Sequence, residues 1–81
     1  MKATVTVELK PGVLDPQGKA IQHSLGALGF SGVEDVRAGK VFRIALNDQL
    51  PKEEAEREIR QMCEKLLANP VVENYSFRFD D

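Results

Sequence analysis

The sequence has few of the residues on which small catalytic, secreted or membrane proteins depend. Its 81 residues include one cysteine, one histidine and no tryptophan. A single cysteine cannot form an internal disulfide or a paired-cysteine metal site. A single histidine, His23, without a second histidine or a carboxylate pair, supplies neither a general base nor a metal cluster. These absences argue against an autonomous enzyme, and we expect no catalytic, cofactor-binding or metal-binding residue in this chain.

Long hydrophobic runs and an excess of basic charge are also missing. The start of the chain has no apolar core of the kind a secretory signal needs, and no apolar run approaches the length that spans a membrane. We therefore expect a cytoplasmic protein with no membrane partner. The net charge is −2, with 11 basic residues scattered among 13 acidic ones. A nucleic-acid-binding protein usually shows a basic excess or stripe, so DNA and RNA are not expected partners.

The length of the chain favours one small domain, residues 1–81, that associates with a second copy. A domain of this size buries only roughly 60–65% of the surface of its unfolded chain. Burial shared with another subunit would add to its stability, and we expect a homodimer at minimum.

Two patterns define the first third of the chain. Apolar and polar residues alternate over residues 2–9, which predicts a strand with one buried face, and Pro11-Gly12 ends it. Asp15 is placed to cap a helix that has Pro16 at its first position, and Gly29 is placed to stop it. The apolar stripe of this helix has helical spacing and consists of Ile21, Leu25 and Leu28.

The rest of the chain predicts two strands, a helix and a strand. Residues 33–38 and 40–46 form two extended runs separated at Gly39, which indicates a hairpin. From Pro51 the period changes to 3.6, and residues 71–79 form a last strand after Asn69-Pro70. The apolar face of the second helix is predicted to consist of Ala55, Ile59, Met62, Cys63, Leu66 and Leu67.

The predicted order β-α-β-β-α-β is that of an α+β, ferredoxin-like two-layer sandwich, with one antiparallel sheet and two helices on one side of it. The side chains expected to face the helices are Val5, Val7, Phe42, Ile44, Phe77 and Phe79. The opposite face of the sheet is expected to show Thr4, Thr6, Val41, Arg43, Asn74, Ser76 and Arg78. This second face is mixed rather than fully polar, so it can meet a partner.

Several residues with possible chemistry have simpler structural interpretations. Cys63 lies on an apolar stripe and is expected to be a core residue rather than a nucleophile. His23 lies off the stripe of its helix and is expected at the surface or in an interface. The aromatic residues of 75–79 could stack RNA bases, but the core of so small a chain needs them. The Asp80-Asp81 terminus is expected to be a solvated tail.

The sharpest candidates for interaction lie between residues 37 and 45. Gly39-Lys40, flanked by Arg37 and Arg43, concentrates positive charge at one end of the predicted hairpin. We predict that Arg37, Gly39 and Lys40 act in docking a partner rather than in folding, the alternative being a turn with a solvated lysine. An unpaired strand offers a row of N–H and C=O groups to a second copy. The candidate dimer contacts on this strand are Val41 and Ala45.

Several stretches together resemble the PurS family, the small subunit of bacterial and archaeal phosphoribosylformylglycinamidine synthase. They are residues 9–18 (LKPGVLDPQG), Gly29-Phe30, residues 36–40 (VRAGK) and residues 62–75 (MCEKLLANPVVENY). The resemblance covers essentially the whole chain. It implies the β-α-β-β-α-β unit, dimers and dimers of dimers.

The resemblance also implies a place in purine biosynthesis. The complex makes formylglycinamidine ribonucleotide from formylglycinamide ribonucleotide, ATP and glutamine. A large synthetase subunit holds ATP, magnesium and substrate, and a glutaminase subunit releases ammonia. The small subunit has no catalytic residues or cofactor of its own. It is expected to bridge the other two subunits and to support the transfer of ammonia, so the chain belongs to an enzyme only as part of a complex.

Two alternatives share the predicted topology. A regulatory domain of the ACT type would bind a small molecule, such as an amino acid, at a dimer interface without other partners. A hydrolase of the acylphosphatase kind would need an arginine in a glycine-rich loop after the first strand, and the loop Lys10-Pro11-Gly12-Val13 supplies none.

Overall fold

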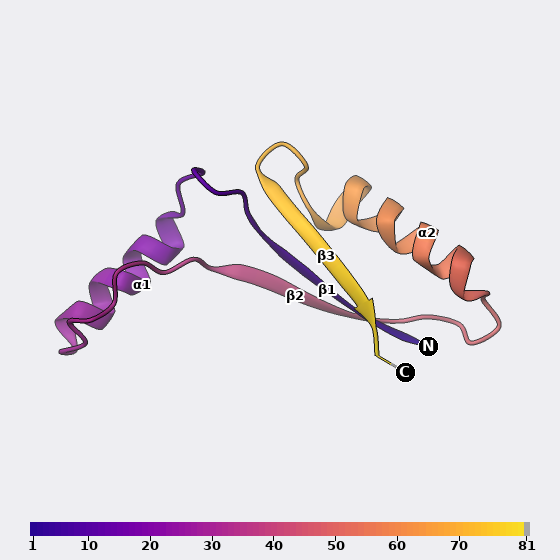
Figure 1. Cartoon of the computed structure of the whole chain (residues 1–81), viewed down its shortest axis with the longest axis horizontal. Helices are drawn as coiled ribbons and strands as arrows, with labels where there is room; N and C mark the ends of the chain where they lie inside the picture. Colours follow the sequence, from indigo (N-terminus) through magenta and orange to yellow (C-terminus); the bar gives the residue numbers. More distant parts are fainter. Residues whose placement is uncertain (81) are drawn as a thin grey trace.

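The computed structural model describes residues 1–80, and Asp81, the last residue of the predicted domain and tail, lies outside them. Six elements follow one another along the chain (Figure 1). They are β1 (Lys2–Leu9), α1 (Pro16–Ala27), β2 (Gly39–Ala45), α2 (Lys52–Met62), the short π-helix η1 (Cys63–Leu67) and β3 (Glu73–Phe79).

The three strands form one antiparallel sheet in the order β2-β1-β3. Val5 on the central strand lies opposite Phe42 of β2 and Phe77 of β3, and Thr4 lies opposite Arg43 and Arg78. Because successive side chains point to opposite faces of a strand, this register puts the predicted apolar set on one face and the predicted mixed set on the other. The α+β class, the single antiparallel sheet and the two helices are confirmed.

The predicted strand over residues 33–38 does not form, and the described chain has no hairpin at Gly39. The segment forms no ladder with a neighbouring strand, and two of its backbone groups bond instead to side chains of Asp15 and of α1. The side chain of Gln22 donates to the carbonyl of Glu34 (3.0 Å), and the N–H of Ala38 donates to the carboxylate of Asp15 (2.7 Å). Held by these two bonds, the segment runs alongside α1 and joins the sheet only at β2.

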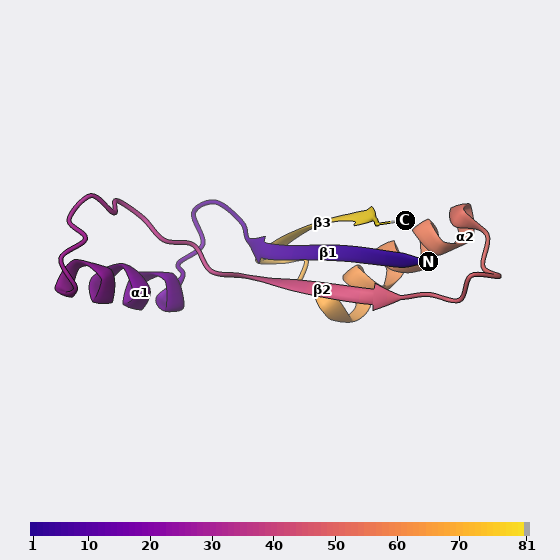
Figure 2. The same ribbon diagram turned by 90° about the horizontal axis from the view of Figure 1, so that it is seen from below.

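The second difference concerns α1, which lies beyond the end of the sheet instead of on its face (Figures 1 and 2). The molecule measures 51 × 26 × 14 Å and has a radius of gyration of 16.3 Å. A compact domain of this length has a radius of gyration of about 12 Å. The excess is the expected result of one helix projecting from the rest of the molecule.

The core lies between the sheet and α2. Val5 and Val7 of β1 are fully buried against Ile59 and Cys63. The outer strands are only half-covered, and cation–aromatic contacts help to seat the helix on β3: the guanidinium of Arg60 lies 5.3 Å from the ring centre of Phe77. One helix therefore covers the central strand fully and its neighbours in part.

Leu66 is 83% exposed, although its spacing placed it on the apolar face of the second helix. The cause is the π-helical turn: the N–H of Ala68 donates to the carbonyl of Cys63 five residues earlier (2.9 Å). The wider turn accommodates an extra residue. It shifts the phase of the helix, so that Leu67 and Ala68 turn toward the sheet and Leu66 turns away.

Within residues 1–80, no helix is both long enough and apolar enough to cross a membrane.

Candidate functional site

The projecting segment is the most distinctive surface of the molecule. We call residues 16–33, which comprise α1 and the start of the returning chain, the arm, and the sheet with α2 and η1 the body. The arm exposes Leu28 (73%) and Phe30 (58%), and Ile21 is 38% exposed. Exposed apolar side chains of this size make the arm a candidate interaction surface. The sequence predicted the stripe containing Ile21 and Leu28, but placed it against the sheet.

The arm is held to the body by a set of contacts that we call the elbow, formed by residues 10–18 and 36–38. Asp15 caps α1, as predicted: the N–H of Gly18 donates to its Oδ1 (2.8 Å), and Pro16 occupies the start of the helix. The other oxygen, Oδ2, accepts the N–H of Ala38 (2.7 Å). One carboxylate thus binds the start of the arm to the chain that returns from it.

Arg37 links the returning chain to the loop that precedes α1. Its Nη1 donates to the carbonyl of Val13 (2.9 Å), and its Nη2 donates to the carbonyl of Lys10 (3.1 Å). Gly18 is buried, and a Cβ placed there would lie 2.1 Å from the carbonyl oxygen of Val36. Arg37 was predicted to act in docking rather than in folding. The structure gives it a structural role, and its docking role remains a prediction.

Gly39 and Lys40 lie at the start of β2 rather than in a hairpin turn. A Cβ at Gly39 would lie 2.8 Å from the carbonyl oxygen of Val7, so glycine permits the close approach of β2 to β1. The ammonium of Lys40 lies 3.7 Å from the carboxylate of Glu73 on β3 and remains half-exposed. Both residues are accessible next to the elbow, as a docking contact requires.

Val41 and Ala45 are exposed side chains of β2 on the face of the sheet opposite α2. Val41 is 54% exposed. β2 is an outer strand of the described sheet, so its free edge is available for pairing. The position of both residues is the one that the dimer prediction requires.

The remaining candidates are structural or exposed. Cys63 is fully buried, and burial raises the pKa of its thiol, which keeps it protonated at neutral pH and supports the core interpretation. His23 is exposed on the arm. Among the described residues, no three histidine, cysteine or acidic side chains are placed to hold a metal ion.

The C-terminal end of β3 is tied down, in contrast to the predicted solvated tail. The carboxylate of Asp80 accepts hydrogen bonds from the hydroxyl of Thr4 and from Nε of Arg78. The N–H of Asp80 donates to the carbonyl of Lys2 (2.9 Å), which extends the pairing of β3 with β1. Asp80 is therefore part of the sheet structure.

The carboxylates of the elbow and of the sheet end predict a loss of stability in acid. Hydrogen bonds from Gly18 and then Ala38 hold the pKa of Asp15 below its ordinary value, and the hydroxyl of Thr4 does the same for Asp80. A lowered folded-state pKa stabilises the fold above the unfolded pKa of about 3.9, and that contribution is lost as pH falls through the folded value. We expect the melting temperature to fall as the pH is lowered below 4.

The Asp15→Asn variant should flatten this fall in a pH series of thermal melts, because it removes one titrating carboxylate while keeping a capping oxygen. The exposed Asp35→Asn variant controls for the loss of one negative charge nearby. If the melting temperatures of Asp15→Asn and the wild type fall in parallel between about pH 6 and about pH 2.5, the Asp15 carboxylate does not contribute to the loss of stability in acid.

Comparison with known proteins assigns the chain to a family. Residues 2–81 match the family model described as "PurS: Phosphoribosylformylglycinamidine (FGAM) synthase". A PurS subunit of phosphoribosylformylglycinamidine synthase from Archaeoglobus fulgidus is 55% identical over 76 residues, which cover 94% of each chain. The chain belongs to the PurS family. It is a subunit of phosphoribosylformylglycinamidine synthase, as the resemblance of its sequence implied.

Two solved structures match nearly the whole chain. The structure of Bacillus subtilis PurS superposes with a TM-score of 0.89 at 40% identity, covering 99% of this chain and 98% of that one. A chain in the structure of PurLQS from Thermotoga maritima matches with a TM-score of 0.74 at 30% identity, covering 95% and 93% of the two chains. Both matches extend over nearly the whole chain, including most of the arm. The ACT-type alternative has no support in these comparisons.

Proposed function

We propose that this PurS subunit bridges the synthetase and glutaminase subunits of phosphoribosylformylglycinamidine synthase and supports the transfer of ammonia between them. The observation that carries the proposal is the arm, which projects from the body on a braced elbow and exposes large apolar side chains. The Thermotoga maritima PurLQS structure, which contains a chain similar to this one, supports an assembly role.

The chemistry of the reaction explains why such a subunit is needed. Ammonia released at one site must reach the second site before it escapes into water, so the two sites must be held in a defined relation. A subunit with a rigid two-layer body and a separate arm can contact two partners at once. ATP, magnesium and the substrates belong to the other subunits in this proposal, and the complex works in the cytoplasm.

The test is a reconstitution in which product is followed first from glutamine and then from added ammonium. The synthetase and glutaminase subunits are mixed with and without this chain. We expect the glutamine-dependent reaction to require the chain and the ammonium-dependent reaction to proceed without it. The chain alone should hydrolyse neither ATP nor glutamine. Equal glutamine-dependent rates in both mixtures would refute the bridging role.

A homodimer is the second part of the proposal, and the exposed area supports it. The chain has an accessible surface of 6064 Å². A compact monomer of 9.0 kDa would expose about 4,900 Å². The excess of about 1,200 Å² is larger than the roughly 800 Å² that one partner contributes to a standard interface. We assign the stripe of the arm, with the free edge of β2, to contact with a second copy.

The dimer contact on β2 can be tested with lysine. The double variant Val41→Lys and Ala45→Lys should weaken self-association by about tenfold or more, because charge on an edge strand opposes pairing. Ser76→Lys, on the same face but on β3, is the matched control. Sedimentation or light scattering across a concentration series measures the result. A wild-type chain that stays monomeric at high micromolar concentration would exclude the homodimer itself.

Docking by Arg37, Gly39 and Lys40 is the third part of the proposal. Lys40→Ala should lower affinity for the other subunits and change stability by no more than about 0.5 kcal/mol, as surface substitutions do. Arg37→Ala should also lower affinity, and it should destabilise the elbow because two backbone carbonyls lose their donor. Binding titrations and thermal melts separate the two effects. Unchanged affinity of the Lys40→Ala variant for both subunits would remove Lys40 from the docking site.

A further inference from the structure

The carboxylate of Asp15 accepts two backbone N–H groups from distant parts of the chain. Its Oδ1 accepts the N–H of Gly18 in the first turn of α1 (2.8 Å), and its Oδ2 accepts the N–H of Ala38 in the returning chain (2.7 Å). Ala38 directly precedes Gly39, where β2 begins. The first bond caps the helix, whereas the second ties the start of the arm to the sheet.

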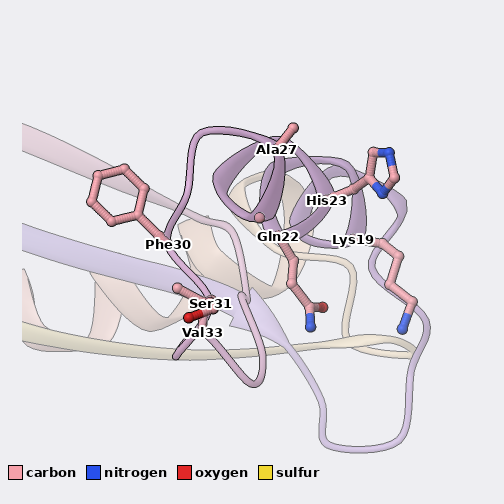
Figure 3. A pocket seen from close by; sticks show the side chains of 8 residues that line it. Lys19, Gln22, His23, Ala27, Phe30, Ser31 and Val33 are labelled. Atoms are coloured by element: carbon pink, nitrogen blue, oxygen red, sulfur yellow. The ribbon is translucent and has the colours of Figure 1, made fainter.

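The direction of α1 is set at its base, because the helix has no broad packing surface on the body. Within the described residues, α1 shares no extensive contact with the sheet or with α2 (Figures 1 and 2). Its one buried residue is Gly18, the donor to Asp15. Further out, the side chain of Gln22 extends from α1 (Figure 3) and donates to the carbonyl of Glu34 (3.0 Å). That bond holds the arm together but does not reach the body.

Arg37 makes the other side-chain bonds of the elbow, and they do not reach the helix. Its guanidinium donates to the carbonyls of Lys10 and Val13, which both precede α1. These bonds fasten the loop before the helix to the returning chain. Among the described side chains of the elbow, Asp15 alone bonds to both α1 and the returning chain.

Capping alone does not require a carboxylate at this position. Asparagine and serine cap helices about as well as aspartate does. Each of them presents one side-chain oxygen, however, and the amide nitrogen of asparagine is itself a donor that cannot accept the N–H of Ala38. The second oxygen of Asp15 therefore serves the link between arm and body, which a cap does not need.

We infer that Asp15 is a positioning residue for the synthase reaction: its two bonds set the angle between arm and body, and with it the relation between the subunits that the chain bridges. The inference rests on the proposed bridging function. Misplacement of reacting groups by about 1 Å can lower a rate as much as a hundredfold. An arm with a loose base can still bind its partner but holds it at a variable angle, so ammonia escapes between the two sites.

The first test is the reconstituted synthase with the chain at a saturating concentration. Asp15→Asn should lower the glutamine-dependent rate by about tenfold or more and leave the ammonium-dependent rate unchanged. The glutamate released for each product formed should rise, because ammonia is lost. Ile59→Val is the matched control: it removes one buried carbon from the core of the body and leaves the elbow intact. It should keep the wild-type ratio of glutamate to product.

The second test measures the direction of the arm without any activity. Spin labels are attached to cysteines that replace Ser24 on α1 and Ser76 on β3, two exposed positions, while Cys63 is buried and stays unlabelled. An excess of unlabelled chain restricts the measurement to distances within one chain. Asp15→Asn should broaden the distance distribution. Asp15→Ser, which also keeps a capping oxygen, repeats both tests should the asparagine variant fail to fold.

The outcomes distinguish this inference from the proposed function. A wild-type ratio of glutamate to product in the Asp15 variants, or an unchanged distance distribution, would overturn the positioning role and leave the bridging role intact. An equal rise of the ratio in Ile59→Val would reduce the effect to a general loss of stability and would also overturn the inference. Failure of the wild-type chain to support the glutamine reaction would overturn the bridging role itself.

Discussion

Replacing Gly18 with alanine is expected to destabilise the protein by about 1–3 kcal/mol, the usual cost of overpacking a tight contact. The added Cβ would lie 2.1 Å from the carbonyl oxygen of Val36 and 2.9 Å from the carboxylate of Asp15. The backbone oxygen cannot move without separating the two sides of the elbow. The arm should therefore lose its fixed direction, and assembly should weaken together with stability.

Gly26→Ala is the matched control, because Gly26 is in the same helix with nothing within 4 Å of the position of an added Cβ. Alanine there should stabilise the protein by roughly 0.5–1 kcal/mol through helix propensity. Chemical denaturation of both variants provides the measurement. Stabilisation by Gly18→Ala comparable with that by Gly26→Ala would show that the elbow is not closely packed.

Replacing Ile59 with alanine is expected to cost about 2–5 kcal/mol, as for other large aliphatic side chains removed from a core. Ile59 is fully buried and packs against the central strand. A loss of this size is a large part of the 5–15 kcal/mol that stabilises a typical domain. We expect the Ile59→Ala variant to unfold at a clearly lower urea concentration than the wild type.

Leu66→Ala tests the π-helical turn in the same assay. The helical spacing alone placed Leu66 and Ile59 on one buried face, whereas the structure leaves Leu66 83% exposed. Its removal should change the stability of the isolated chain by about 0.5 kcal/mol or less. A cost for Leu66→Ala close to that for Ile59→Ala would mean that η1 is an ordinary α-helical turn in solution.

The strand faces and the first helix start could be predicted because their signals are local. Alternation with period 2 correctly assigned Val5, Phe42 and Phe77 to one face, since neighbouring residues of a strand must point in opposite directions. Asp15 followed by Pro16 predicted the start of α1 from capping chemistry alone. Each of these signals involves residues only a few positions apart.

The direction of the arm could not be predicted because contacts between distant residues set it. Asp15 bonds to Ala38 and Arg37 bonds to Lys10, 23 and 27 residues away in the chain. An extended run such as residues 33–38 has the same local pattern whether it pairs with a strand or crosses a helix. The ferredoxin-like topology predicted that this run pairs with a strand. Its bonds to Gln22 and Asp15 hold it against the first helix instead.

The prediction that Leu66 lies on the buried face of the second helix was wrong for another reason. A period of 3.6 holds only while each N–H bonds to the carbonyl four residues earlier. The bond from Ala68 to Cys63 breaks that rule near the end of the second helix. No residue type between positions 63 and 67 predicts a π-helical turn. An apolar residue in the last turn of a helix can therefore be assigned to the wrong face.

The hydrogen bond from Asp80 to Lys2 brings the two ends of the described chain together at the end of the sheet away from the arm (Figure 1). An affinity tag or a fluorophore attached at either terminus would therefore stand clear of the elbow and the arm. The same closeness allows two copies to be joined in tandem by a flexible linker that starts and ends on the same side of each body. Such a linker raises the effective concentration of the second copy to the millimolar range. A tandem chain would separate the contribution of self-association from that of the other subunits.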